Sequence, residues 1–413
     1  MDAEADALLW CVLPDFDIQL SRPRIPVSTR GRVRATLPES WTRMRTSTLR
    51  AAAGGLVVTR AEVEERVIAP VIGESFRVPV PVARVRRAAG ARAARQVKAW
   101  VDDVLSEHGR PEWRRPWREA VNAAAEHLER YARLDLSRYR FVLLPRQSHP
   151  IVRALILMAE EQGIPTVFLP HSPMTTWQVD LPFSYAGLRG DAERELVVAR
   201  LAADPARILV VGNPATTVLE DPMPPLRADL PGVLAVSPDP EPVLRHVIEL
   251  LQQGGLDRVL VAPHPRSDLS VLRRLMPHGW EMHRGNRTLE LLRQGAPWMI
   301  QMSSGVAWEA AALGIPTADV RWNGREPDYP FLADETVFRS LRNPDDVVRF
   351  IATVSEFDRE QSRVHARAWS AVDGAEAVTR IRAFLSDIDG PRPRIADGWA
   401  PGGALRVASR LRV

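Results

Sequence analysis

Two short polar motifs, each placed directly after an apolar run, contain the residues of this sequence best suited to chemistry. The first motif, PHPR, contains His264 and Arg266, and the second, SSG, comprises Ser303, Ser304 and Gly305 and precedes a helical pattern. Imidazole, guanidinium and hydroxyl groups, together with the unpaired N–H groups at a helix start, suit an anion. Because the motifs lie one strand–helix–strand unit apart, we expect them to hold the phosphate of a nucleotide between two strand ends.

Glu309 follows Gly305 by one helical turn, where its carboxylate can accept hydrogen bonds from the hydroxyls of a ribose. The simpler alternative is that Ser-Ser-Gly only caps a helix and that His-Pro only forms a turn. The order and spacing of the two motifs together favour the interpretation as a ligand site.

A second group of polar residues follows apolar runs in the first half of the chain. The candidates for binding an acceptor substrate, or for removing the proton of its hydroxyl group, are His171, Arg146, His149, Asp15 and Asp17. His171 ends the apolar run at residues 166–169, where an imidazole with a near-neutral pKa can take the proton of an acceptor hydroxyl. Simpler alternatives stay open: His171 or His149 only hydrogen-bonds its own loop, and Arg146 only forms a surface ion pair.

The composition restricts the classes of protein to which the chain can belong. Its 413 residues exceed one ordinary core and predict two domains of roughly 150 to 200 residues each. Hydrophobic residues make up 45% and charged residues 26%, as in a soluble globular protein. The net charge is only +4, and no basic stripe alternates with aromatic residues, so nucleic acid is not an expected partner.

Cysteine and histidine usage argues against a disulfide and a metal site. Cys11 is the single cysteine, so it forms no intrachain disulfide and offers no cysteine-based metal site. His278 and His283 lack a third ligand at suitable spacing, and we expect neither a metal nor another cofactor. No apolar segment approaches about 18 residues, and the N-terminus is acidic rather than basic. We therefore expect a cytoplasmic protein without a transmembrane segment.

Short apolar runs alternate with helical patterns along most of the chain, which favours an α/β fold with doubly wound parallel sheets. In the second half we expect strands at residues 233–237, 258–262, 280–283, 298–302 and 317–320, with helices between them. In the first half we expect strands at 8–13, 56–59, 141–144, 166–169 and 208–211, and helices at 91–105, 117–134, 151–162 and 191–203. Asp15 and Asp17 would then follow the first strand.

Proline and charge patterns predict where the domains meet. Residues 220–231 combine prolines with charges, which favours an extended linker. We expect an N-terminal domain at 1–222, a linker at 223–231, a C-terminal domain at 232–389 and a basic tail rich in proline and glycine at 390–413. The prolines of residues 76–87 exclude that stretch from a central strand.

Four segments, in this order, resemble motifs of bacterial surface-polysaccharide glycosyltransferases with the GT-B architecture. They are GIPTVFLPHS at 163–172, ILVVGNP at 208–214, VAPHPR at 261–266, and Ser303-Ser304 followed by Glu309-Ala310 and LGIP at 313–316. The last two resemble motifs shared by polysialyltransferases, capsule glycosyltransferases and teichoic-acid glycerophosphotransferases, with related patterns in UDP-N-acetylglucosamine 2-epimerases. The sequence departs from the family beside His171, where it has Pro170 and Ser172 in place of Gln and Gly.

The resemblance implies two Rossmann-type domains that face a central cleft, with a nucleotide-activated donor held in the C-terminal domain. His264, Ser303 and Ser304 would contact the donor phosphate, and the rest of the donor site would consist of Arg266, Gly305 and Glu309. Transfer to an acceptor hydroxyl would need no metal, because His264, the helix start and Arg266 would neutralise the leaving phosphate. His171 and His264 would be the catalytic residues.

Two other classes of function stay open. A nucleotide-sugar epimerase or hydrolase on the same fold should carry paired acidic residues in its N-terminal half, where only Asp15 and Asp17 offer them. A non-catalytic relative would bind a nucleotide or a partner. The expected partners are a nucleotide-sugar donor and a hydroxyl acceptor, in polysaccharide or secondary-metabolite biosynthesis. A homodimer and peripheral contact with a membrane stay open.

Overall fold

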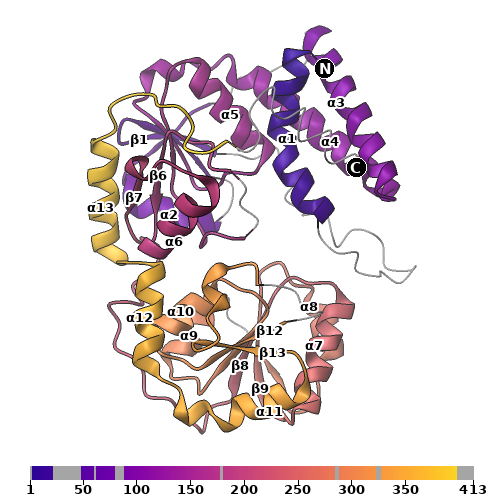
Figure 1. Cartoon of the computed structure of the whole chain (residues 1–413), viewed down its shortest axis with the longest axis vertical. Helices are drawn as coiled ribbons and strands as arrows, with labels where there is room; N and C mark the ends of the chain where they lie inside the picture. Colours follow the sequence, from indigo (N-terminus) through magenta and orange to yellow (C-terminus); the bar gives the residue numbers. More distant parts are fainter. Residues whose placement is uncertain are drawn as a thin grey trace.

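The computed structural model describes residues 2–21, 48–59, 62–79, 88–176, 180–283, 288–321 and 327–397. These residues form two α/β domains, one above the other in Figure 1, each built around its own sheet. The expected architecture of two α/β domains with parallel sheets is therefore confirmed. Among the helices that these residues form, none is both long enough and apolar enough to cross a membrane.

The N-terminal domain contains a seven-stranded sheet in the order β3-β1-β2-β4-β5-β6-β7. Its strands are β1 (Thr48–Ala52), β2 (Gly55–Thr59), β3 (Phe76–Arg77), β4 (Val142–Leu144), β5 (Thr166–Phe168), β6 (Tyr185–Leu188) and β7 (Ile208–Val210). The strands from β2 to β7 pair in parallel, whereas β1 pairs antiparallel with β2 and β3. β3 lies at the edge of the sheet, the place where a proline-rich neighbour is tolerated.

Helices cover both faces of this sheet. They are α1 (Ala3–Ser21), α2 (Glu62–Ile72), α3 (Ala88–Glu107), α4 (Arg114–Tyr131), α5 (Pro150–Glu161) and α6 (Asp191–Leu201). One buried cluster joins α1, α3, α4 and α5 to side chains of β4 to β6. A second cluster joins α2 to the opposite face, through Val57, Leu143 and Val167.

The first helix replaces an expected strand. Residues 8–13 lie inside α1, and all of them are buried because α1 packs among α3, α4 and α5. A run that is apolar on every side shows no period, so its pattern alone does not distinguish a buried strand from a buried helix. The strand expected at residues 8–13 is therefore wrong, and Asp15 and Asp17 lie in α1 rather than at a strand end.

The C-terminal domain contains a six-stranded, wholly parallel sheet in the order β10-β9-β8-β11-β12-β13. Its strands are β8 (Gly232–Val236), β9 (Val259–Pro263), β10 (Glu281–Met282), β11 (Met299–Gln301), β12 (Thr317–Val320) and β13 (Phe338–Leu341). Its helices are α7 (Glu241–Gln253), α8 (Leu269–Leu275), α9 (Thr288–Arg293), α10 (Val306–Ala312), α11 (Pro344–Ala352) and α12 (Arg359–Trp369). The strands expected in this half are confirmed, and β13 follows them.

The chain crosses between the domains at two places, which lie side by side. Asn213 forms a parallel bridge with Asp373, and its N–H donates to the carbonyl of Val372 at 2.9 Å. The Asp373 carboxylate in turn accepts the N–H of Leu219 at 2.7 Å. Gly212 permits this approach: it has a left-handed φ of 87°, and a Cβ there would lie 2.4 Å from the Val372 carbonyl oxygen.

The last helix returns to the N-terminal domain. α13 (Gly374–Ser386) lies beside α2, and its Ile381 and Phe384 join the buried cluster on that face of the N-terminal sheet (Figure 1). Farther along, the N–H of Ile395 donates to the carbonyl of Phe183 at 2.8 Å. The boundary expected at residue 389 therefore differs from the packing, because residues 374–397 contribute apolar side chains to the N-terminal core.

We expect Phe384→Ala to destabilise the N-terminal domain selectively. The variant removes a buried ring that packs near Gly187 of β6, and the cavity should lower the free energy of unfolding by about 3 to 5 kcal/mol. Hydrogen exchange measured by mass spectrometry should become faster in β5 and stay unchanged in β11. Val364→Ala, at a side chain of α12 that is 67% exposed, is the matched control and should alter neither strand. Faster exchange confined to β11 would contradict this assignment of α13.

Candidate active site

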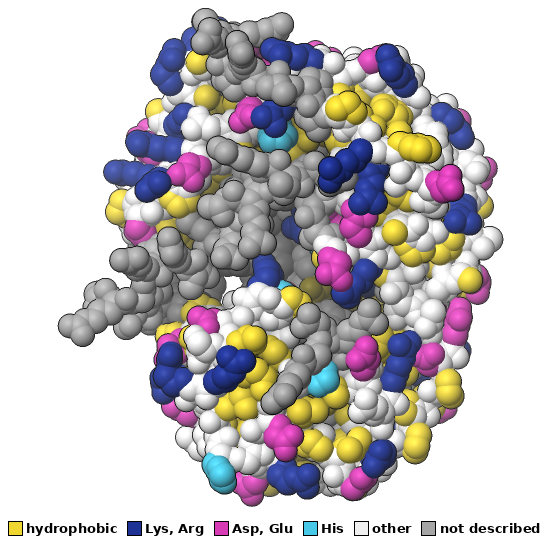
Figure 2. Space-filling model, turned by 180° about the vertical axis from the view of Figure 1, so that it is seen from behind, with side chains coloured by type: hydrophobic (Ala, Val, Ile, Leu, Met, Phe, Trp, Pro, Cys, Tyr) yellow, Lys and Arg dark blue, Asp and Glu magenta, His cyan; other side chains and the backbone are white. Residues whose placement is uncertain are grey.

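The carboxyl ends of the two parallel sheets meet between the domains. The N–H of Thr176, in the loop after β5, donates to the carbonyl of Asp328 in the C-terminal domain at 2.8 Å. Gly305, after β11, lies beside Pro173: a Cβ there would be in ordinary contact with the proline Cδ, at 3.5 Å. Figure 2 shows the surface hollowed between the two domains. Ligands of open α/β sheets bind at this edge, so the site is expected here.

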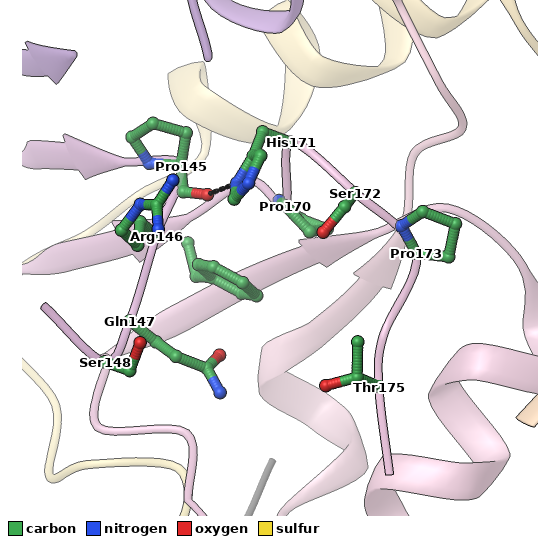
Figure 3. Close-up of a pocket in the computed structure, with 10 residues that line it drawn as sticks. Pro145, Arg146, Gln147, Ser148, Pro170, His171, Ser172, Pro173 and Thr175 are labelled. Atoms are coloured by element: carbon green, nitrogen blue, oxygen red, sulfur yellow. Dashed lines mark hydrogen bonds between the residues drawn. The ribbon is translucent and has the colours of Figure 1, made fainter. Parts of the chain in front are cut away.

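A pocket lies on the N-terminal side of this cleft, between the loops that follow β4 and β5 (Figure 3). It encloses about 500 Å³, part of which is open to solvent. Its polar lining consists of Arg146, Gln147 and Ser148 after β4, and His171, Ser172 and Thr175 after β5. Pro173 also lines the pocket, which therefore reaches the contact between the domains.

His171 is half-buried, with its ring turned toward the carbonyl of Pro145 (Figure 3). Nδ1 lies 2.6 Å from that carbonyl oxygen. Because a carbonyl oxygen only accepts, Nδ1 carries the hydrogen, and Nε2 of the neutral ring is the acceptor. Burial, followed by the positive charge of Arg146, lowers the pKa of His171 to about 4. The near-neutral pKa expected from the sequence is wrong, but the tautomer leaves Nε2 able to take a proton.

Arg146 and His149 have different surroundings. Arg146 donates from Nε to the buried carboxylate of Glu64 at 2.8 Å and also lines the pocket. His149 is buried, and its Nδ1 accepts the N–H of Ile151 at 3.2 Å, so that it caps α5. His149 is not one of the residues that line the pocket, and its hydrogen bond agrees with the simpler alternative, in which it only bonds to its own loop. The side chains of the remaining acceptor candidates, Asp15 and Asp17, lie outside the described part of the structure.

His264 follows β9 on the opposite side of the cleft and is half-buried. Its backbone N–H donates to the carbonyl of Val236 at 3.1 Å, and its Nδ1 accepts the N–H of Arg266, also at 3.1 Å. Nε2 of the neutral ring therefore carries the hydrogen. Burial, and then the charge of Arg266, lowers the pKa of His264 to about 4. At pH 7 this imidazole offers a phosphate a neutral N–H donor rather than a positive charge.

The Ser-Ser-Gly motif is held by hydrogen bonds that the sequence does not predict. Ser303 has a left-handed φ of 49°, unusual for a residue with a side chain, and its Oγ accepts the N–H of Asp328 at 2.8 Å. The Oγ of Ser304, one residue before the N-cap Gly305 of the seven-residue α10, accepts the N–H of Val306 at 3.4 Å. The N–H of Ser304 donates to the side-chain oxygen of Gln301. The helix start therefore offers fewer donors than expected, while the Ser303 hydroxyl hydrogen can still be donated.

Asp319 is a buried residue of β12 that supports the motif and that sequence reasoning missed. Its Oδ1 accepts the N–H of Ser303 at 2.9 Å and the side-chain amide of Gln301 at 2.7 Å. Burial raises the pKa of Asp319 to about 6, against the opposing effects of the Ser303 N–H and of Arg321. A carboxylate inside the otherwise uncharged strand TADV was the available sequence signal.

Glu309 lies one turn into α10 and is half-buried. Burial raises its pKa to about 7, and the positive charge of Arg189 is the strongest of the opposing effects. Arg189 follows β6 in the other domain, so Glu309 lies near the boundary between them. Sequence reasoning also missed Arg189, because it did not recognise β6. The role of Glu309 toward a ribose stays a prediction.

No group of three or more His, Cys, Asp or Glu side chains suited to a metal ion occurs among the residues that the structure describes. Each side of the cleft instead offers histidine, hydroxyl and arginine side chains, which suit hydrogen-bonded anions better than divalent cations. A metal-independent reaction stays a prediction, and activity in excess EDTA is its test.

No model of a known protein family matches the chain, and none of the curated proteins compared with it matches. Solved structures do match. The UDP-GlcNAc 2-epimerase of Methanocaldococcus jannaschii in complex with UDP-GlcNAc and UDP is 14% identical, with a TM-score of 0.46, over 64% of this chain and 80% of that one. The enzyme of that name from Neisseria meningitidis, bound to UDP-GlcNAc, is 12% identical, with a TM-score of 0.47, over 71% and 90%.

The lipopolysaccharide outer core galactosyltransferase WaaB is 15% identical, with a TM-score of 0.39, over 64% of this chain and 80% of that one. Both kinds of protein are named as acting on sugars, but all these similarities are weak in sequence and in structure. The chemistry of the cleft therefore has to be inferred from the residues of this chain.

Asp319→Asn should change stability in a pH-dependent way. The folded pKa of about 6 lies above the ordinary value of 3.8, so wild-type stability is lost as the pH rises through this range. The amide keeps the oxygen that accepts both hydrogen bonds but does not ionise. Relative to wild type, the variant should therefore gain roughly 2.5 kcal/mol between pH 4 and pH 7.5. Urea unfolding at both pH values checks this, and a difference between the proteins that does not vary with pH would contradict it.

Proposed function

We propose that this chain transfers a glycosyl or glycerophosphate group from a nucleotide-activated donor to an acceptor hydroxyl, without a metal ion. The observation that carries the proposal is a pair of neutral imidazoles on opposite sides of one cleft, with complementary tautomers. His171 presents a proton acceptor in the N-terminal pocket, and His264 presents a hydrogen-bond donor after β9. A transfer reaction needs both, a base for the attacking hydroxyl and a donor for the leaving phosphate.

In this proposal the acceptor hydroxyl enters the pocket beside His171. Its oxygen forms a bond to the transferred carbon or phosphorus atom while its proton passes to Nε2. The bond from that atom to the phosphate oxygen of the nucleotide breaks, and the oxygen keeps the electron pair. A nearby phosphate raises the pKa of an imidazole, since negative charge favours the protonated ring. The pKa of about 4 therefore applies to His171 in the free protein, before an anionic ligand enters the cleft.

The leaving phosphate would accept hydrogen bonds from the Nε2–H of His264 and the hydroxyl of Ser303. Support comes from the hydrogen bonds that orient both groups: Arg266 N–H fixes the tautomer of His264, and Asp328 N–H occupies the acceptor side of Ser303 Oγ. The Nε2 hydrogen of His264 and the hydroxyl hydrogen of Ser303 are therefore both available to a ligand. Donors held in place before the reaction stabilise developing charge without the cost of reorganisation.

Nucleotide binding and acceptor dependence test the proposal. Thermal shift with CMP, CDP, UDP, GDP and TDP identifies the base that the chain binds. Nucleotide-activated sugars and glycerol of that base are then incubated with a panel of glycosides that carry free hydroxyls, in the presence of EDTA. Release of the nucleotide only with an acceptor supports transfer. Turnover without an acceptor would indicate an epimerase or hydrolase, and binding without any turnover would indicate a non-catalytic protein.

His264→Ala should lower kcat about a hundredfold or more, the usual cost of removing a donor to a developing oxyanion. His278→Ala removes an exposed histidine of the same domain and is the matched control. The comparison is made by steady-state kinetics, after circular dichroism shows that both variants are folded. A near-wild-type kcat in folded His264→Ala would exclude the phosphate role.

His171→Asn should lower kcat by roughly 10² to 10⁴ while leaving the Kd of the nucleotide nearly unchanged. The asparagine amide can still donate to the Pro145 carbonyl, so the loop is retained while the proton acceptor is lost. The acidic limb of the wild-type profile of kcat/KM should report a pKa near 4, because activity is lost as His171 becomes protonated. An unchanged limb in the variant would assign the base to another residue.

A further inference from the structure

Arg189 is a buried cation at the carboxyl edge of the N-terminal sheet. It directly follows β6 and precedes α6. Only 7% of its surface is exposed. Its Nε has no hydrogen-bond partner, and its guanidinium forms no ion pair with any residue that the structure describes. Buried charged groups are normally paired, so this side chain calls for an explanation.

The nearest fixed negative charge does not satisfy the guanidinium. Glu193 is fully buried and interacts electrostatically with Arg189. Its two carboxylate oxygens, however, accept backbone hydrogens: Oε1 takes the N–H of Met174 at 2.9 Å, and Oε2 takes the N–H of Arg189 at 3.0 Å. Both oxygens of the Glu193 carboxylate thus bond to the main chain rather than to the guanidinium. The carboxylate offsets the charge of Arg189 from a distance and leaves the guanidinium donors unused.

The other groups that interact electrostatically with Arg189 lie in both domains. Glu309 and Tyr329 belong to the C-terminal domain, and His171 lines the N-terminal pocket. The hydroxyl of Tyr329 would lie 3.8 Å from a Cβ on Gly305, next to the Ser-Ser-Gly motif. The charge of Arg189 therefore acts on groups of both domains, at the place where the two halves of the site meet.

We propose that Arg189 binds the phosphate group of the donor, holding it from the N-terminal domain while His264 donates from the C-terminal domain. This inference rests on the proposed function. A guanidinium offers phosphate two parallel hydrogen bonds and a charge that does not titrate. Those are the two properties that the neutral imidazole of His264 lacks. Arg266, which the sequence suggested for this task, is exposed, so its charge is screened by water.

Isothermal titration of the full-length chain tests the inference with two probes, inorganic pyrophosphate and the nucleoside diphosphate that gives the largest thermal shift. Arg189→Gln should weaken both by at least tenfold, since hydrogen bonds to charged groups are worth about 1.5 to 3 kcal/mol. The parent nucleoside, which lacks phosphate, should bind as it does to wild type. Arg200→Gln removes an exposed arginine of α6 and is the matched control.

Arg189→Lys provides a second variant, because it keeps the charge opposite Glu193 and protects the fold. It should show an intermediate loss of pyrophosphate affinity. Unchanged pyrophosphate affinity in a folded variant, while wild type still catalyses transfer, would overturn the role of Arg189 and leave the proposed function intact. Pyrophosphate binding that depends on Arg189, without any nucleotide binding, would support the anion site and overturn the proposed function. Absence of pyrophosphate binding by wild type would overturn the inference.

Discussion

The paired chain crossings at residues 212–219 and 370–374 set the geometry on which the site depends. Each domain contributes half of the cleft, so the distance between His171 and His264 follows from how the domains are joined. The crossings are fixed to each other through Asn213 and Asp373, and Gly212 permits their close approach. Asp373 is buried, and burial raises its pKa to about 6. Because α13 returns to the N-terminal core, the connection is a double one, which restricts relative motion more than a single linker does.

Removal from water explains the electrostatic character of the cleft. The pKa of both His171 and His264 is lowered, and that of Glu309 is raised, with burial as the first cause in each case. Burial disfavours the charged form of every titratable group, whatever its sign. Arginine does not lose its proton in proteins, so it keeps its charge under the same conditions. A cleft of neutral imidazoles with persistent guanidinium charge favours an anionic ligand.

The sequence predicts the regular alternation of strands and helices better than it predicts elements that depart from that alternation. Parallel strands alternating with helices were evident in the second half, where apolar runs such as that of β8 are separated by helices with one apolar face. The helix that contains residues 8–13 was not evident from the sequence, because an apolar run that is buried on all sides shows no periodic pattern. The placement of His171 and His264 at strand ends also followed from local pattern.

Other site properties depend on contacts between distant segments. The pKa values of the histidines follow from burial, and the left-handed backbone of Ser303 from hydrogen bonds to Asp319 and Asp328. Arg189 was missed because β6 contains glycine and a single tyrosine, a weak strand pattern. The sequence therefore located the strand ends of β9 and β11, where we propose that the donor binds, but not Arg189 of the other domain.

A crystal structure of the full-length chain with a bound nucleoside diphosphate tests the central claim most directly. We expect the phosphate oxygens to lie within hydrogen-bond distance of His264 Nε2 and of the Arg189 guanidinium, with Nε2 of His171 facing the space beside them. A nucleotide whose phosphates lie outside the cleft, or in contact with neither residue, would contradict it.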